Sequence, residues 1–142
     1  MKLEGTLAID AGAIIELLFQ TKGGILLRNS LLEEIAYGYT TEIAITEVIY
    51  ILCRRFGWEE SYKRIDKLTN SGYIEVYETG QLVDIAAKYK CERSISLADC
   101  FTLALAKKLN CNALFARREQ ELLKEIDKKS FDVEILFLED FV

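Results

Sequence analysis

The segment from Ser94 to Phe115 limits the possible folds most strongly. Ser96 is placed to cap a helix, and every residue from Cys100 to Ala106 except Thr102 is apolar. A helix that is apolar on nearly all sides is buried in a core, with other elements packed around it. Asp99 then lies in the first turn of a buried helix, where a carboxylate needs hydrogen bonds, a counter-charge or a metal ion.

Asp99 also has a purely structural explanation. Ser96 and Asp99 have nearly the spacing of a capping box, in which an acidic side chain bonds back to the cap and complements the positive end of the helix dipole. On this segment alone capping is the better explanation, because caps are far commoner than active sites. The other acidic residues of the chain have to decide between the two.

Short apolar runs alternate with helical patterns along the whole chain. The patterns predict strands at 7–9, 41–45, 73–77, 113–116 and 133–137, and helices at 13–19, 25–36, 46–56, 58–71, 81–89 and 119–128, with the buried helix beginning at Leu97. Gly38 is expected to end the second of these helices. This alternation predicts an α/β fold with a mainly parallel sheet covered on both faces, and we expect residues 1–142 to form one domain.

Composition excludes several kinds of site. The chain has no histidine, and its four cysteines include no Cys-x-x-Cys pair, which excludes the usual zinc sites and histidine bases. We expect reduced cysteines, with a bridge between Cys91 and Cys111 as the alternative. The net charge of −5 requires any nucleic-acid contact to be local. No window resembles a membrane span, and the expected location is the cytoplasm.

Three acidic residues have the same sequence context as one another. Asp10, Glu47 and Asp99 each follow a short strand or a loop, open a helix and precede an apolar run. In a parallel sheet such junctions lie on one edge, so the three carboxylates are expected to converge. Converging anions repel, and a divalent cation relieves that repulsion; oxygen ligands favour Mg²⁺ or Mn²⁺. Taken singly, each acid is equally explained by capping or by the helix dipole.

Together these motifs resemble the PIN-domain family. The resemblance rests on Asp10 in Ala-Ile-Asp-Ala-Gly-Ala, Glu47 in Ile-Thr-Glu-Val-Ile-Tyr, and Asp99 in Ile-Ser-Leu-Ala-Asp-Cys, followed by Ala-Leu-Phe-Ala from Ala113. In length and motif order the chain is similar to the small ribonucleases of VapC toxin type. The resemblance implies a three-layer α/β/α sandwich with a five-stranded sheet, and an Mg²⁺- or Mn²⁺-dependent endoribonuclease. It also implies a homodimer and an antitoxin partner.

The resemblance assigns roles residue by residue. It implies that Asp10, Glu47 and Asp99 are metal ligands, with Glu47 binding the ion or positioning a water. The family usually has Thr-x-Asp after its fourth strand, whereas this chain places Arg117 and Glu119 at those two positions. Glu119 is the expected fourth acid, acting through water, and Glu121 is the alternative. Further candidates for the substrate site are Ser96, which matches a small hydroxyl residue of the family, and Arg93, Arg117 and Arg118, which are placed to hold phosphates.

The sequence is compatible with two functions other than a nuclease. One is a PIN-fold module of little activity that dimerises or holds a partner protein, using the apolar and aromatic segments 48–56 and 58–68. The other is a nucleotide-binding α/β domain, which the absence of a Gly-x-Gly-x-x-Gly motif or a P-loop makes the weaker alternative.

Overall fold

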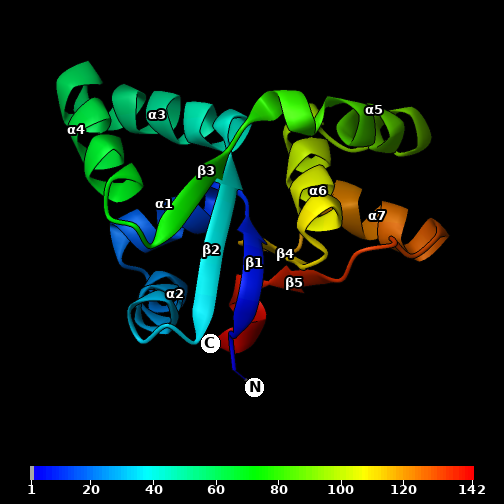
Figure 1. Ribbon diagram of the computed structural model, residues 1–142, viewed down its shortest axis with the longest axis horizontal. Coiled ribbons are helices and arrows are strands. Elements are labelled where there is room, and N and C mark those ends of the chain that lie inside the picture. The colour runs from blue at the N-terminus through cyan, green and yellow to red at the C-terminus, as the bar shows by residue number, and fades with distance from the viewer. Residues whose placement is uncertain (1) are drawn as a thin grey trace.

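The computed structural model describes residues 2–142, which form one five-stranded parallel sheet in the order β3-β2-β1-β4-β5 (Figure 1). The strands are β1 (Gly5–Ile9), β2 (Ala36–Thr41), β3 (Ile74–Tyr77), β4 (Asn112–Phe115) and β5 (Ile135–Phe137). The helices are α1 (Ala11–Phe19), α2 (Lys22–Leu32), α3 (Glu42–Phe56), α4 (Trp58–Thr69), α5 (Val83–Glu92), α6 (Leu97–Leu109) and α7 (Gln120–Lys128), with short 3-10 helices at Thr79–Gln81 and Leu138–Phe141.

Helices cover both faces of the sheet, and each face has its own hydrophobic core. Leu7 and Ile9 of β1 point into the first core, which is built with α1 to α4, while Ala8 between them points into the second, built with α5 to α7. Successive strand residues face opposite sides, so both faces of β1 are buried and its residues read as a continuous apolar run. The predicted three-layer α/β/α sandwich is therefore confirmed.

The expected central helix is α6. Ser96 is its N-cap, and the hydroxyl oxygen accepts a hydrogen bond from the Asp99 amide at 3.1 Å. All residues from Cys100 to Ala106 are buried in the second core, Thr102 included. An all-round apolar helix is thus enclosed as its composition requires.

The predicted boundaries between residues 25 and 45 are wrong. Helix α2 already ends at Leu32, because Glu34 adopts a left-handed conformation and the amide of Ile35 donates to the carbonyl of Ser30, forming a Schellman motif. Residues 36–41 then pair with β1 as β2. Gly38 lies inside this strand instead of ending a helix, and a Cβ there would lie 3.0 Å from Ile9 Cδ1.

The second strand was predicted at 41–45, but it ends at Thr41 because α3 begins there. Thr41 ends β2 and caps α3, its hydroxyl accepting a hydrogen bond from the amide of Ala44 at 2.9 Å. Ile43 and Ile45 are therefore helical, although β-branched residues favour strands. As a consequence Glu47 lies in the second turn of α3, not in the first as expected.

All four cysteines are free, so the alternative of a bridge between Cys91 and Cys111 is wrong. Cys91 is exposed on α5, whereas Cys111 is half-buried just before β4. Across residues 2–142, no helix combines the length and the apolar character that crossing a membrane requires.

Candidate functional site

Asp10 stands at the carboxyl end of the central strand. Its amide donates to the carbonyl of Leu114 in β4 at 3.0 Å, which extends the β1–β4 pairing by one residue. Beside it, the buried hydroxyl of Thr40 donates to the carbonyl of Ile9 at 2.7 Å. The Asp10 carboxylate caps α1, with Oδ1 accepting from the amide of Ala13 at 3.0 Å. The predicted cap is therefore real, and it holds the carboxylate at the sheet edge.

The other acids reach this edge from three separate helices. Asp99 is in the first turn of α6, Glu47 is in the second turn of α3, and Glu119 is the N-cap residue of α7 just after β4. Helix α6 contacts β1, β2 and α3, and Figure 1 shows α3 and α6 on either side of the ends of β1 and β2. The parallel topology thus gathers side chains that are far apart in the sequence.

The pKa values show that these carboxylates interact. Burial raises the pKa of Asp10 to about 7, and the charges of Asp99 and Glu119 contribute to the rise. Burial also raises the pKa of Asp99 to about 6, with contributions from Glu119 and Glu47. The pKa of Glu47 is raised by burial and by the charge of Glu119. The four predicted acids therefore lie in one electrostatic site, which we call the acid cluster: Asp10, Glu47, Asp99 and Glu119.

Glu119 has closer relations with the cluster than Glu121 has. Its charge raises the pKa of Asp10, Glu47 and Asp99, whereas Glu121 affects that of Asp99 only. Glu119 also lines a cavity of ≈ 250 Å³ together with Asp10 and Arg117. The geometry favours Glu119 as the fourth acid, and the longer glutamate side chain does not prevent it from reaching the cluster.

The cluster has the donor chemistry of a site for a hard cation. It offers only carboxylate oxygens, and no positive group among the causes of the shifts at Asp10 and Asp99 offsets their repulsion. Gly12 leaves room beside Asp10, since a Cβ there would lie 3.5 Å from Asp10 Oδ2. With the present side-chain conformations, no group of three or more His, Cys, Asp or Glu within residues 2–142 is positioned to hold an ion. Metal binding therefore requires the side chains to converge further.

Sequence reasoning missed Glu16. This residue of α1 lines the same cavity as Asp10 and Glu119, and its Oε1 accepts a hydrogen bond from the hydroxyl of Thr21 at 2.9 Å. Glu16 interrupts an apolar helical run, as Glu47 does. An acid within an apolar helical run could have indicated Glu16. It was not predicted because it does not follow a strand directly.

Two of the predicted phosphate-binding arginines are engaged elsewhere. Arg93 donates to the carbonyls of Glu125, Lys129 and Ser130 at 2.7 to 3.0 Å, and its guanidinium lies 3.9 Å from the centre of the Phe131 ring. It ties the loop before α6 to the end of α7, so the predicted role in substrate binding would require these bonds to break.

Arg118 is likewise paired, with both of its terminal nitrogens bonded to the Asp140 carboxylate and a further contact to Glu139. A phosphate would therefore have to compete with these two carboxylates for the exposed Arg118 guanidinium. Arg117 lines the cavity beside Asp10 and forms no ion pair within residues 2–142. It is the arginine of the three that stays a candidate.

Comparisons with known proteins agree with this architecture. Similar solved structures include VapBC-1 from nontypeable Haemophilus influenzae, with TM-score 0.67, 22% identity and coverage of 95% of this chain and 98% of that one. VapC20 from Mycobacterium tuberculosis, a sarcin-ricin loop cleaving toxin, has TM-score 0.64, 17% identity and coverage of 84% and 94%. A toxin-antitoxin complex from Klebsiella pneumoniae has TM-score 0.60, 13% identity and coverage of 82% and 89%. These likenesses show the fold.

No curated protein matches the chain. The family model described as PIN domain, however, matches residues 7–129, which include the whole acid cluster. The match covers most of the chain, and it includes all four acids of the cluster. This chain therefore belongs to the PIN-domain family.

Proposed function

We propose that the protein is an Mg²⁺- or Mn²⁺-dependent endoribonuclease, acting as the toxin of a toxin-antitoxin pair. The observation that carries the proposal is the acid cluster, in which three of the carboxylates have pKa values raised by burial and by their neighbours. Such a site is suited to a divalent cation, and clusters of perturbed carboxylates mark functional sites. Membership of the PIN-domain family and the cleaving activity of VapC20 support a nuclease.

In this proposal each acid of the cluster has its own role. Asp10 and Asp99 hold the ion, and Glu47 approaches from α3 to bind it or to orient the attacking water. A bound Mg²⁺ or Mn²⁺ supplies a Lewis acid that polarises the scissile phosphate and lowers the pKa of water. Glu119 orients water at the outer side of the site, and Arg117 pairs with a flanking phosphate. Ser96 keeps the Asp99 backbone in place by capping α6.

The test is cleavage of single-stranded RNA by the purified protein. We expect endonucleolytic products with Mg²⁺ or Mn²⁺, none with EDTA, and full recovery when Mg²⁺ is added back in excess. Cleavage that continues in EDTA would contradict the metal-dependent mechanism. A protein that cuts no RNA under any of these conditions, but binds a partner protein tightly, would favour the PIN-fold module instead.

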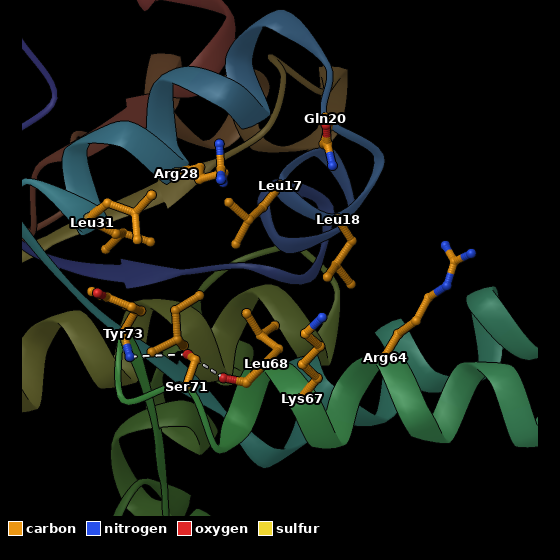
Figure 2. A pocket seen from close by; sticks show the side chains of 12 residues that line it. Leu17, Leu18, Gln20, Arg28, Leu31, Arg64, Lys67, Leu68, Ser71 and Tyr73 are labelled. Carbon is orange, nitrogen blue, oxygen red and sulfur yellow. Dashed lines mark hydrogen bonds between the residues drawn. The ribbon is translucent and has the colours of Figure 1, made fainter.

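One observation favours a partner-binding role beside the nuclease. A cavity of ≈ 520 Å³ lies between α1, α2, α4 and β3, and Figure 2 shows Leu17 and Leu18 of α1 opposite Leu68 and Lys67 of α4. Arg28, Arg64 and Lys67 line it together with leucines. We propose that an antitoxin segment with apolar and acidic side chains binds here. The proposed binding surface differs from the expected one at 48–56 and 58–68. Of those two segments, only residues of α4 line the cavity.

We also propose a homodimer and a cytoplasmic location. The homodimer follows from the resemblance to VapC-type toxins, and its measurement is the molar mass in solution by light scattering. The cytoplasmic location follows from the proposed RNA substrate.

The fourth acid can be tested with a matched pair of variants. We expect Glu119→Gln to lower kcat/KM by about 10- to 100-fold, as for residues that act on a metal through water, and Glu121→Gln to change it by less than about threefold. The side chain of Glu119 forms no capping hydrogen bond, so its replacement by glutamine should leave α7 intact. Loss of activity in Glu121→Gln alone would show that the acids after β4 are assigned in the wrong register.

A further inference from the structure

One face of α3 connects the acid cluster to exposed residues that the proposed mechanism does not use. Ile43, Glu47, Tyr50 and Arg54 are spaced at i, i+4, i+7 and i+11, which places them along one side of a helix; we call them the α3 stripe. Ile43 packs against the second core, where α6 lies, whereas Val48 of the same helix packs into the first. The stripe therefore runs along the side of α3 that turns toward α6.

The outer half of the stripe is an aromatic ring held beside a cation. Tyr50 is 42% exposed, although it is a large side chain in the middle of a 15-residue helix. The guanidinium of Arg54 lies over this ring, 5.0 Å from its centre. Arg54 is exposed and forms no ion pair within residues 2–142. Tyr50 belongs to neither hydrophobic core, so the exposed part of its ring and the Arg54 guanidinium can both contact a ligand.

The position of the pair fits a nucleic-acid strand that enters the acid cluster. One turn of helix separates Tyr50 from Glu47, a rise of about 4.5 Å, and Arg54 is about 6 Å further along the axis. An acid cluster on a protein of net charge −5 repels a polyanion, so cations close to the site are needed to hold one. Arg93 and Arg118 are already engaged, whereas Arg54 on α3 and Arg117 in the cavity beside Asp10 form no ion pair within residues 2–142.

We propose that Tyr50 and Arg54 form a nucleotide subsite for single-stranded RNA next to the cleaved bond. A base stacks on the exposed part of the Tyr50 ring, and Arg54 pairs with the adjoining phosphate. Stacking on an aromatic ring suits every base, so the subsite positions the strand without reading its sequence. The subsite rests on the proposed ribonuclease function, because it gives the strand its path to Glu47.

Binding measured without cleavage tests the subsite by itself. Full-length Asp99→Asn protein with Mg²⁺ is titrated against a fluorescent single-stranded RNA, and affinity is read by anisotropy. We expect added Tyr50→Leu to weaken binding about 10-fold, and Tyr50→Phe, which keeps the ring, to stay within about twofold. Arg54→Ala should weaken binding and reduce the salt slope by about 1. The matched control is Tyr62→Leu, which replaces a 55% exposed tyrosine on α4 and should change nothing.

A second measurement links the ring to one base. The affinity is measured for a series of RNAs that each lack one base at a different position. At one position, removal of the base should make the Tyr50→Leu variant bind as tightly as the protein that keeps Tyr50. Equal losses in Tyr50→Leu and Tyr62→Leu, or a Tyr50→Leu loss that no missing base cancels, would overturn the subsite. A fall in molar mass of Tyr50→Leu by light scattering would also overturn it, because the stripe would then be an interface between copies.

The subsite and the ribonuclease proposal fail in different ways. Wild-type cleavage with unchanged binding in Tyr50→Leu would overturn the subsite alone. Absence of wild-type cleavage together with Tyr50-dependent RNA binding would support the subsite and overturn the nuclease.

Discussion

Replacing Asp99 by Asn is expected to lower metal-dependent RNA cleavage by roughly 10³-fold, the scale on which removal of a group that stabilises developing charge acts. The amide removes one negative charge from the proposed metal site. It leaves the fold intact, because the bond that starts α6 runs from the Asp99 backbone amide to Ser96 Oγ. Asp10→Asn should have the same effect, since asparagine is also a good N-cap and can still accept from the amide of Ala13.

The control for both variants is Asp127→Asn, which removes an exposed carboxylate from α7 and should keep full activity. Initial rates on one RNA, with thermal unfolding followed by circular dichroism, separate loss of chemistry from loss of folding. Wild-type rates in both Asp10→Asn and Asp99→Asn would remove the catalytic assignment of the cluster.

Without divalent cations, the protein is expected to become less stable as the pH rises from 5 to 8. The pKa values of Asp10 and Asp99 are raised to about 7 and about 6 from the ordinary 3.8, so the folded state binds more protons than the unfolded state in this window. Their contribution is fully present below the unfolded pKa and is lost as the pH passes the folded values. The chain contains no histidine, so no other side chain of ordinary pKa titrates between pH 5 and 8.

Mg²⁺ should reverse this loss at high pH. An ion at a hundred times its Kd adds about 2.7 kcal/mol to the free energy of unfolding, or several degrees in Tm. The gain should be smaller at pH 5, where protons compete for the same oxygens. Calorimetry at pH 5 and pH 8, with EDTA or Mg²⁺, measures both effects. In Asp10→Asn the metal-free protein should be more stable than wild type at pH 8, with little further gain from Mg²⁺.

The opposite pH trend, or an equal gain from Mg²⁺ in wild type and Asp10→Asn, would contradict this account. Carboxylates with lowered pKa act in the other direction, since their contribution is lost as the pH falls. Glu42, which accepts two hydrogen bonds from Thr79, and Asp132, beside Lys107 and Tyr89, belong to this class. Their effect appears below about pH 4, outside the measured window.

The sequence predicted those parts of the fold that depend on local apolar patterning. The all-round apolar α6 and the strand that ends at Asp10 both lie where their residues place them. The failure between residues 25 and 45 has a specific cause. Glu34 adopts a left-handed conformation that is more typical of glycine or asparagine, and Thr41 caps a helix whose first residues favour strands. Tertiary packing outweighed local propensity at both positions.

The positions of the acids could be predicted because one rule, an acid near the start of a helix that follows a strand or a loop, applies to them. Asp10 lies at such a junction, Asp99 lies in the first turn of α6, and Glu47 lies one turn further along α3 than the rule expects. The basic part of the site could not be predicted, because a sequence does not show whether a guanidinium is free. Arg93 is bonded to three carbonyls and Arg118 to two carboxylates, and these contacts span 21 to 37 residues, so no local pattern predicts them. The roles of the acids themselves stay predictions until the variants are measured.

The cap formed by Asp10 has a consequence for ion selectivity. Oδ1 accepts a hydrogen bond from the amide of Ala13, so Oδ2 has more acceptor capacity left and is the oxygen better placed to bind an ion. Monodentate coordination suits Mg²⁺, which requires octahedral geometry and retains several waters, whereas Ca²⁺ readily takes carboxylates in bidentate fashion and reaches seven or eight ligands. The start of α1 thus biases the centre toward the smaller ion.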